Sequence, residues 1–317
     1  MTLTPPFLVH WDDVPANRPD VPAVGGAWQG LGRAAGSVTV GVNRVRLDPG
    51  EVSTPAHAHG ADEEIFHVLS GSGLSWQDGT TYAVSAGDTL VHAPRREAHT
   101  LRAGDDGLEF LVYGGRTELG GAYLPKAGLY WLYPTWTEAG TGEHPFQRDQ
   151  HLTWPDPAAE RPKNIVRADD VEGAFGGIMR GLGKAAGATR SGLNLVSLPP
   201  GAEGAPPHCH SSEEELFVVL DGSGTLELWS PPDPANPRQT EPAERHELRR
   251  GHVVSRPAAT RIPHCFRAGQ DGLTFLAYGT RDPADHCWYP RSNTVSIRGL
   301  GVVFRPELVP WGDGEPE

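Results

Sequence analysis

Apolar residues along this chain occur in short runs that end at Gly, Pro or Asp. Four such runs span residues 38–42, 65–69, 89–91 and 108–113. Short runs of this kind, rich in β-branched and aromatic residues and separated by turn residues, are typical of the strands of a β-sandwich or barrel. The pattern therefore predicts an all-β fold with few short helices.

The chain also contains an internal repeat, which indicates two copies of one folding unit. GLGRAAG at 30–36 recurs as GLGKAAG at 181–187, and EIFHVLSGSG at 64–73 recurs 151 positions later as ELFVVLDGSG. Upstream, LVHWDDV at 8–14 is similar to IVRADDV at 165–171. After a Pro-rich stretch at 230–238 the offset becomes 165, which indicates an inserted surface loop. We expect an N-terminal barrel with a leading arm at 1–140, a connection at 141–164, and a C-terminal barrel with a tail at 165–317.

Composition and charge exclude some folds and some classes of binding partner. The 40 Gly and 30 Pro among 317 residues oppose long helices. A net charge of −13 without any basic run makes nucleic acid and anionic membranes unsuitable partners. The sequence shows no signal peptide and no apolar run of about 18 residues, and its three Cys have no paired spacing. We therefore expect a cytoplasmic protein that acts on a small molecule, with a homo-oligomer left open.

Each copy carries three histidines and one glutamate at matching positions. His57 and His59 are two residues apart on a predicted strand, so their side chains share one face. Glu64 opens the next strand, and His99 comes from a third. The second copy repeats the set as His208, His210, Glu215 and His264. Imidazole and carboxylate ligands suit Fe, Mn, Ni, Zn, Co or Cu, so we predict a divalent transition metal, up to one per barrel.

These residues resemble the two motifs of the cupin superfamily, and in particular the bicupins, in which two small β-barrels are fused. Both copies match the first motif, with Gly50, His57, His59, Glu64 and Gly71, and with Gly201, His208, His210, Glu215 and Gly222. Both match the second motif, with Gly87, Pro94 and His99, and with Gly251, Pro257 and His264, although the spacing is irregular. The resemblance implies two tandem cupin-type barrels (double-stranded β-helix, or jelly-roll) with a metal site in each.

The resemblance also implies an enzyme, for which dioxygenase, decarboxylase and isomerase chemistry are open. We expect an oxygenase acting on a small organic acid, carbonyl or aromatic substrate. We rank oxalate decarboxylase chemistry lower, because the chain has no match to the acidic lid loop of those enzymes. The retained Glu64 and Glu215 count against bicupin gentisate dioxygenases. The alternative from another class is a non-catalytic cupin that binds a small molecule.

A few further residues adjoin the predicted metal sites. Phe66 and Phe217 each lie two residues after the metal-site glutamate, which puts them on its face, so we expect them to line the substrate pocket or to pack in the core. His67 and His92 lie on strands beside the first site. His67 has the opposite parity to Glu64, so we expect it to point outward. We assign no catalytic residue beyond these.

Overall fold

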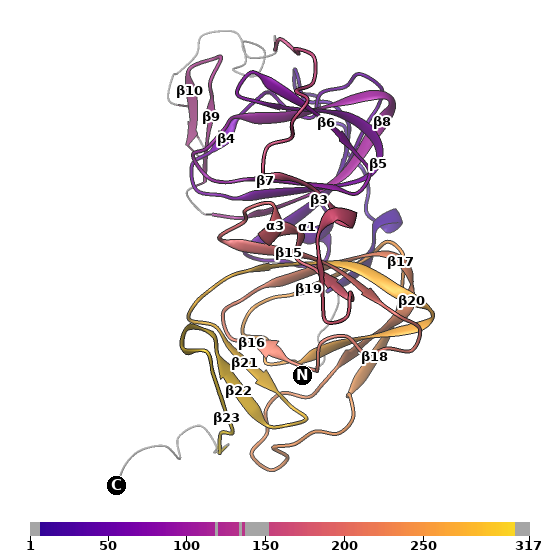
Figure 1. Cartoon of the computed structure of the whole chain (residues 1–317). Coiled ribbons are helices and arrows are strands. Elements are labelled where there is room, and N and C mark those ends of the chain that lie inside the picture. Colours follow the sequence, from indigo (N-terminus) through magenta and orange to yellow (C-terminus); the bar gives the residue numbers. More distant parts are fainter. Residues whose placement is uncertain (1–6, 118–119, 133–134, 137–151, 308–317) are drawn as a thin grey trace.

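The computed structural model describes residues 7–117, 120–132, 135–136 and 152–307, and it confirms the all-β prediction. Two β-barrels are stacked one above the other, and the N-terminal end of the chain lies in the C-terminal barrel (Figure 1). Within the described ranges, α-helix is limited to α1 (Leu31–Ala34) and α3 (Leu182–Ala185), which both lie between the barrels. No helix in this part of the chain is long and apolar enough to cross a membrane.

The N-terminal barrel is built from a larger and a smaller antiparallel sheet. The larger has the order β12-β7-β5-β8-β3-β2, with β6 also paired to β5. Its strands are β2 (Ala27–Gln29), β3 (Val40–Leu47), β5 (Glu64–Gln77), β6 (Thr80–Ser85), β7 (Asp88–His92), β8 (His99–Gly115) and β12 (Ile165–Arg167). The smaller joins β4 (Ala58–His59), β9 (Gly121–Leu124), β10 (Leu129–Leu132) and β11 (Thr135–Trp136).

The C-terminal barrel repeats this plan with its own two sheets. The larger has the order β1-β19-β17-β20-β15-β14-β13, with β18 also paired to β17. Its strands are β1 (Leu8–His10), β13 (Gly173–Ala174), β14 (Met179–Arg180), β15 (Ser191–Leu198), β17 (Glu215–Leu228), β18 (Glu244–Arg249), β19 (His252–Arg256) and β20 (His264–Thr280). The smaller joins β16 (Cys209–His210), β21 (His286–Tyr289), β22 (Thr294–Ile297) and β23 (Val302–Phe304), and three 3-10 turns lie at Trp11–Asp13, Ala168–Asp170 and Arg298–Leu300.

The repeated glycine of the first motif marks a bulge in one long strand of each barrel. The pairing of β5 with β8 shifts register on both sides of Gly71, which has φ +78°. A Cβ there would lie 2.2 Å from the carbonyl oxygen of Gly107. Gly222 in β17 has the same strained conformation and the same close approach, to Gly272. Only glycine fits both requirements, which explains why the two copies share it.

The two barrels exchange a strand. β1, from the N-terminal end of the chain, pairs with β19 of the C-terminal barrel, with Val9 opposite Val253. β12 pairs with β7 of the N-terminal barrel, with Val166 opposite Thr89. The ranges 1–140 and 165–317 stay our proposed division of the chain, but one strand from each range completes the sheet of the other. Residues 141–151 of the expected connection lie outside the described residues.

A shared apolar core joins the barrels. Leu31, Val42 and Tyr113 from the first barrel pack in one cluster with Leu182 and Tyr278 from the second. The rings of Tyr113 and Tyr278 stack with centroids 5.0 Å apart. A matching pair of buried glutamates, Glu63 and Glu214, also crosses this seam.

Each glutamate at the seam accepts hydrogen bonds from the opposite barrel. The Glu63 carboxylate accepts them from the amides of Thr189 (2.9 Å) and Ser191 (3.0 Å). The Glu214 carboxylate accepts them from the amides of Val38 (2.8 Å) and Thr39 (2.5 Å). The two sets of contacts are equivalent under the internal repeat. Glu214 lies 151 residues after Glu63, and Thr189 lies 151 residues after Val38.

Candidate metal centres

The four predicted ligands of the N-terminal barrel converge in its interior. His57 and His99 form an isolated bridge between neighbouring segments, His59 lies in β4, and Glu64 is the first residue of β5. The Oε2 atom of Glu64 lies 2.9 Å from His99 Nε2, 3.1 Å from His59 Nε2 and 3.9 Å from His57 Nε2. We call this group the N-terminal tetrad.

The C-terminal barrel brings its four predicted ligands together in the same way, from the matching strands. The Oε2 atom of Glu215 lies 3.3 Å from His264 Nε2, 3.4 Å from His210 Nε2 and 4.0 Å from His208 Nε2. This oxygen is buried, and no described residue forms a hydrogen bond with it. We call this group the C-terminal tetrad.

The electrostatics favour the neutral form of some tetrad histidines but not of all. Burial disfavours protonation of His59 and His210, but the neighbouring carboxylates of Glu64 and Asp285 outweigh it and raise the pKa of both rings. Burial lowers the pKa of His57 and of His99 to about 4, and that of His264 to about 3. Burial by itself raises the pKa of Glu64. The adjacent His59 and His99 outweigh this effect and hold the pKa well below its usual value, so the carboxyl stays ionised. Neutral imidazoles around a carboxylate are the forms that coordinate a divalent cation.

The donor set and the partnerless oxygen of Glu215 both fit a divalent transition metal in each barrel. Three imidazole nitrogens and one carboxylate oxygen point at a common position, which is how such an ion is held. No sulfur belongs to either tetrad. We keep all eight residues as the proposed ligands.

The family follows from comparison with known proteins. The cupin domain family matches the chain over residues 43–113 and 194–277, and each region contains one complete tetrad. The chain is a bicupin. A search of curated protein sequences finds no match to it.

Solved structures show the same fold at low sequence identity. Oxalate decarboxylase from Bacillus subtilis at pH 4.6 is 16% identical, with a TM-score of 0.58, over 90% of this chain and 79% of that one. Lactobacillus farciminis oxalate decarboxylase in a formate complex is 14% identical, with a TM-score of 0.60, over 89% and 88% of the two chains. A further structure of the B. subtilis enzyme concerns its Mn(II) centres, at 15% identity and a TM-score of 0.58, over 90% and 80%.

The two centres of this bicupin differ in the residue beside the metal-site glutamate. On the neighbouring strand, His92 is paired with Glu64 in the first barrel, and Arg256 is paired with Glu215 in the second. Residues paired across antiparallel strands point to the same face of the sheet. Each of these side chains therefore lies in a barrel interior, next to a proposed metal ligand.

His92 fills its position with a ring that is already stacked and hydrogen-bonded. It stacks on His99 with centroids 3.8 Å apart and an interplanar angle of 4°. Its Nδ1 lies 2.8 Å from Glu97 Oε1, and the amide of Asn164 donates a second hydrogen bond to that oxygen at 3.3 Å. The sequence correctly placed His92 beside the first site. The structure adds that its partner there is an acidic group.

Arg256, in contrast, is a buried cation whose hydrogen-bonding capacity is mostly unused. The side chain is 3% exposed, and its Nη2 donates to the carbonyl oxygen of Ile262 at 2.6 Å. Its Nε and Nη1 have no partner among the described residues. Burial lowers the pKa of Arg256 to about 10, so the guanidinium keeps its charge at neutral pH.

Arg256 was missed in the sequence because it has no counterpart of the same kind, the matching place in the first copy being held by His92. Both residues lie five positions after the glycine of the second motif, Gly251 and Gly87. The strand pairing shows that the two positions are equivalent, each opposite the metal-site glutamate.

A cavity of about 240 Å³ adjoins the C-terminal tetrad. His208, His210 and Glu215 contribute to its wall, on the side of Glu215 that faces β20 and away from Arg256. Arg281 and Arg298 also line it. Arg298 is ion-paired with Glu213, which lines the same cavity, so part of the positive charge there is balanced.

The predicted pocket phenylalanines are buried beside the tetrads. Phe66 lies edge-on to His99 with centroids 5.8 Å apart, and Phe217 lies edge-on to His264 at 5.4 Å. Both belong to barrel cores, and Phe217 does not line the described cavity. Their role as substrate-lining residues stays a prediction.

His67 lies on the outer face of β5, as its parity predicts, but it is not exposed. It is 4% exposed, and its Nδ1 lies 2.8 Å from the hydroxyl oxygen of Thr89. Ile65, on the same face, belongs to the core shared by the barrels. His67 thus points outward from the barrel as expected, but it does not reach solvent, because other residues cover the outer face of this sheet.

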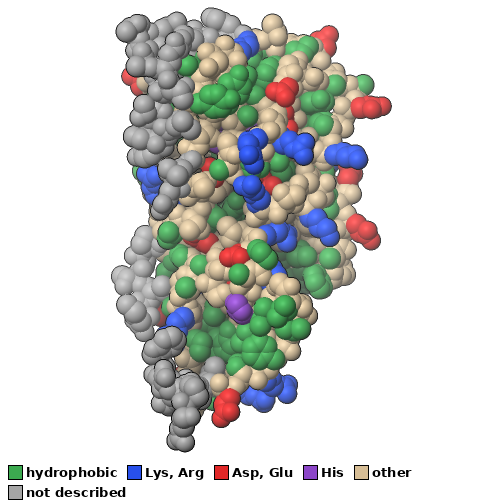
Figure 2. Space-filling model, turned by 90° about the vertical axis from the view of Figure 1, so that its left-hand side faces the viewer, with side chains coloured by type: hydrophobic (Ala, Val, Ile, Leu, Met, Phe, Trp, Pro, Cys, Tyr) green, Lys and Arg blue, Asp and Glu red, His purple; other side chains and the backbone are tan. Residues whose placement is uncertain are grey.

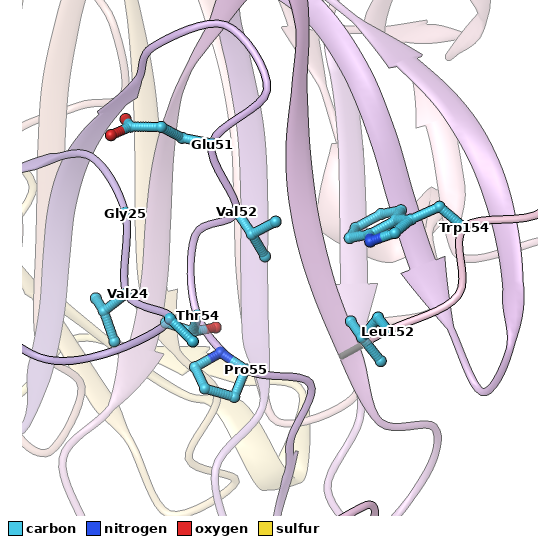
Figure 3. Close-up of a pocket in the computed structure, with 9 residues that line it drawn as sticks. Val24, Gly25, Glu51, Val52, Thr54, Pro55, Leu152 and Trp154 are labelled. Carbon is cyan, nitrogen blue, oxygen red and sulfur yellow. The ribbon is translucent and has the colours of Figure 1, made fainter. Parts of the chain in front are cut away.

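A second cavity lies behind the N-terminal tetrad. It measures about 310 Å³ and is lined by Val52, Thr54 and Pro55, with Leu152 and Trp154 across from them (Figure 3). The carbonyl oxygen of Pro55 lies 3.0 Å from His57 Nδ1. The cavity wall thus supports a proposed ligand from outside, and it offers no buried charge to a substrate.

Proposed function

We propose that this bicupin is a metal-dependent decarboxylase of a small carboxylic acid and that the C-terminal centre performs the reaction. The observation that carries the proposal is Arg256, whose Nε and Nη1 are buried without a partner next to Glu215. The partnerless N–H groups of a buried guanidinium are donors suited to the oxygens of a carboxylate. Leaving them unpaired costs free energy, which a bound anion would offset.

Charge in and around the centre supports the same substrate class. A dication held by three neutral imidazoles and one carboxylate keeps a net positive charge. Arg256 adds another charge, and Arg281 and Arg298 line the adjoining cavity. Figure 2 shows Lys and Arg side chains gathered across the middle of one face of a protein whose net charge is −13. Local positive potential of this kind favours the approach of an anion.

The comparisons favour decarboxylation over the oxygenase that we expected from the sequence. The solved structures of similar fold reported above are oxalate decarboxylases. At 14–16% identity they show the fold alone, so they support the reaction type only together with Arg256. No residue of the described chain specifically favours an oxygenase.

The residues of the chain have defined tasks in this reaction. Arg256 would bind and orient the carboxylate through its unpaired N–H groups, in an interior where such bonds are strong. A divalent ion on the C-terminal tetrad supplies a Lewis acid that polarises a carboxylate oxygen. Decarboxylation breaks the bond between the carboxylate carbon and its neighbour, releases CO₂ and leaves an electron pair on the remaining fragment. That fragment takes up one proton, so no oxidant is consumed.

The test is a turnover assay on the full chain loaded with Mn²⁺, with oxalate and other two- to four-carbon acids as substrates. We expect CO₂ release without matching O₂ uptake. Arg256→Gln should raise KM by about tenfold or more, since a hydrogen bond to a charged group contributes about 1.5–3 kcal/mol. The matched control is Arg245→Gln, which removes a half-exposed arginine of the same barrel and should leave KM unchanged.

Two results would contradict the proposal. Stoichiometric O₂ uptake with an oxygenated product would indicate the oxygenase. Carboxylate binding without turnover of any acid in the set would indicate the non-catalytic binding protein.

A further inference from the structure

The outer contacts of the C-terminal tetrad include one carboxylate with two separate sets of partners. Asp285 precedes β21 and is 1% exposed. Its Oδ2 lies 2.7 Å from His210 Nδ1. Its Oδ1 accepts hydrogen bonds from the backbone amides of Ser211 (3.1 Å), Ser212 (3.0 Å) and Glu213 (3.2 Å). One oxygen therefore holds the imidazole, and the other holds the loop that follows it.

This geometry fixes the tautomer of His210. A carboxylate oxygen only accepts, so Nδ1 must donate and carry a proton. In the neutral ring, the lone pair is then on Nε2, the atom that faces Glu215 Oε2 at 3.4 Å. A carboxylate behind a metal-binding histidine orients the ring and strengthens it as a ligand.

The N-terminal tetrad lacks this support. β4 pairs with β9 as β16 pairs with β21, so that His59 is opposite Ala122 and His210 is opposite Cys287. At the offset of 165, the residue matching Asp285 is Gly120, which has no side chain to offer. No carboxylate of the described chain lies within hydrogen-bond distance of His59 Nδ1.

We propose that Asp285 is a positioning residue that orients His210 and makes the C-terminal centre the tighter of the two metal sites. The inference concerns metal affinity and holds whatever reaction the centre performs. It predicts that the two centres, although they share one ligand set, lose metal to a chelator in a fixed order, with the N-terminal centre first.

Asp285→Asn separates the two sets of contacts. The Asn carbonyl oxygen still accepts from the three amides, so the loop keeps its shape. The Asn amide nitrogen cannot accept from His210 Nδ1. The test uses the full chain with His57→Ala and His59→Ala, so that only the C-terminal centre binds Mn²⁺. In that background, competition with a chelating dye should show affinity weakened by about 10–100-fold, with the melting temperature of the metal-free protein unchanged.

Asp282→Asn is the matched control. Asp282 lies on the same loop and its carboxylate accepts from the amide of Ala284 at 2.8 Å, without touching an imidazole. It should leave Mn²⁺ affinity unchanged. Unchanged affinity in a folded Asp285→Asn variant would overturn the proposal.

A measurement on the unmutated protein covers the case in which the variant fails to fold. In ¹⁵N-labelled, metal-free protein, His210 should carry its proton on Nδ1, with a downfield imidazole proton resonance. Protonation on Nε2 alone would overturn the proposal. So would earlier loss of Mn²⁺ from the C-terminal centre than from the N-terminal one.

Discussion

A single position separates the two centres most clearly. His92 and Arg256 occupy the same place relative to the metal-site glutamate, yet one is a stacked, hydrogen-bonded ring and the other a buried cation with free donors. The first arrangement is complete without a ligand, whereas the second requires an anion to complete its hydrogen bonds. We therefore assign substrate binding to the C-terminal barrel and leave the N-terminal centre a structural or supporting task.

The ligand assignment makes a prediction about metal content. Glu64→Gln and Glu215→Gln should each reduce the bound metal from two ions per chain to one, because each removes the only carboxylate of one tetrad. The double variant should bind none with high affinity. Elemental analysis of untagged protein after dialysis measures this, and two retained ions in either single variant would show that the named glutamates are not ligands.

Phe217 offers a second prediction at this scale. If it is a core residue that supports His264, Phe217→Ala should lower the free energy of unfolding by about 3–5 kcal/mol, and Phe217→Leu by less than about 1.5 kcal/mol. Urea unfolding measures both. A raised KM in Phe217→Leu at unchanged stability would instead support the pocket role that the sequence suggested.

The sequence was most informative where the chemistry is repeated. The eight proposed ligands stand out in the sequence because histidine and glutamate recur together in both copies. Arg256 and Asp285 do not, since each occurs in one copy only. A feature without a counterpart carries no signal in a repeat, and its meaning depends on strand pairing.

At the scale of elements, the internal repeat predicts two barrels, but it does not predict which strands complete each sheet. The similarity of 8–14 and 165–171 reflects two equivalent strands, β1 and β12, each followed by a 3-10 turn. The sequence suggests that each strand belongs to the copy that follows it. Their local propensities are the same in either barrel, so only tertiary packing decides that they are exchanged.

The exchange predicts a crossed response to strand-breaking substitutions. Val9→Pro removes a backbone donor from β1 and should lower hydrogen-exchange protection in β19 of the C-terminal barrel. Val166→Pro in β12 should lower it in β7 of the N-terminal barrel. Loss of protection in the barrel nearer in sequence, for either variant, would contradict the exchanged pairing.

For the whole molecule, the seam between the barrels is more than apolar contact. Glu63 and Glu214 each receive backbone amides from the opposite barrel, and each directly precedes a proposed metal ligand in the sequence. Buried carboxylates with several donors tie the barrels into one cooperative unit.

Removing one of these carboxylates should therefore affect both barrels. Glu63→Ala leaves the buried amide and hydroxyl of Ser191 without their acceptor, at a cost of about 1–3 kcal/mol for each such group. Scanning calorimetry should show a lower melting temperature and a single transition that broadens or divides in two. A change confined to local mobility, with the melting temperature unchanged, would contradict this role of the seam.

The central claim is that this bicupin binds a small carboxylate at the C-terminal centre, between a divalent metal and Arg256. A crystal structure of the Mn²⁺-loaded protein with oxalate tests it most directly. We predict a metal ion on His208, His210, Glu215 and His264, with an oxalate carboxylate accepting a hydrogen bond from the Arg256 guanidinium. Oxalate bound only in the N-terminal barrel, or bound at the C-terminal metal without contact to Arg256, would contradict it.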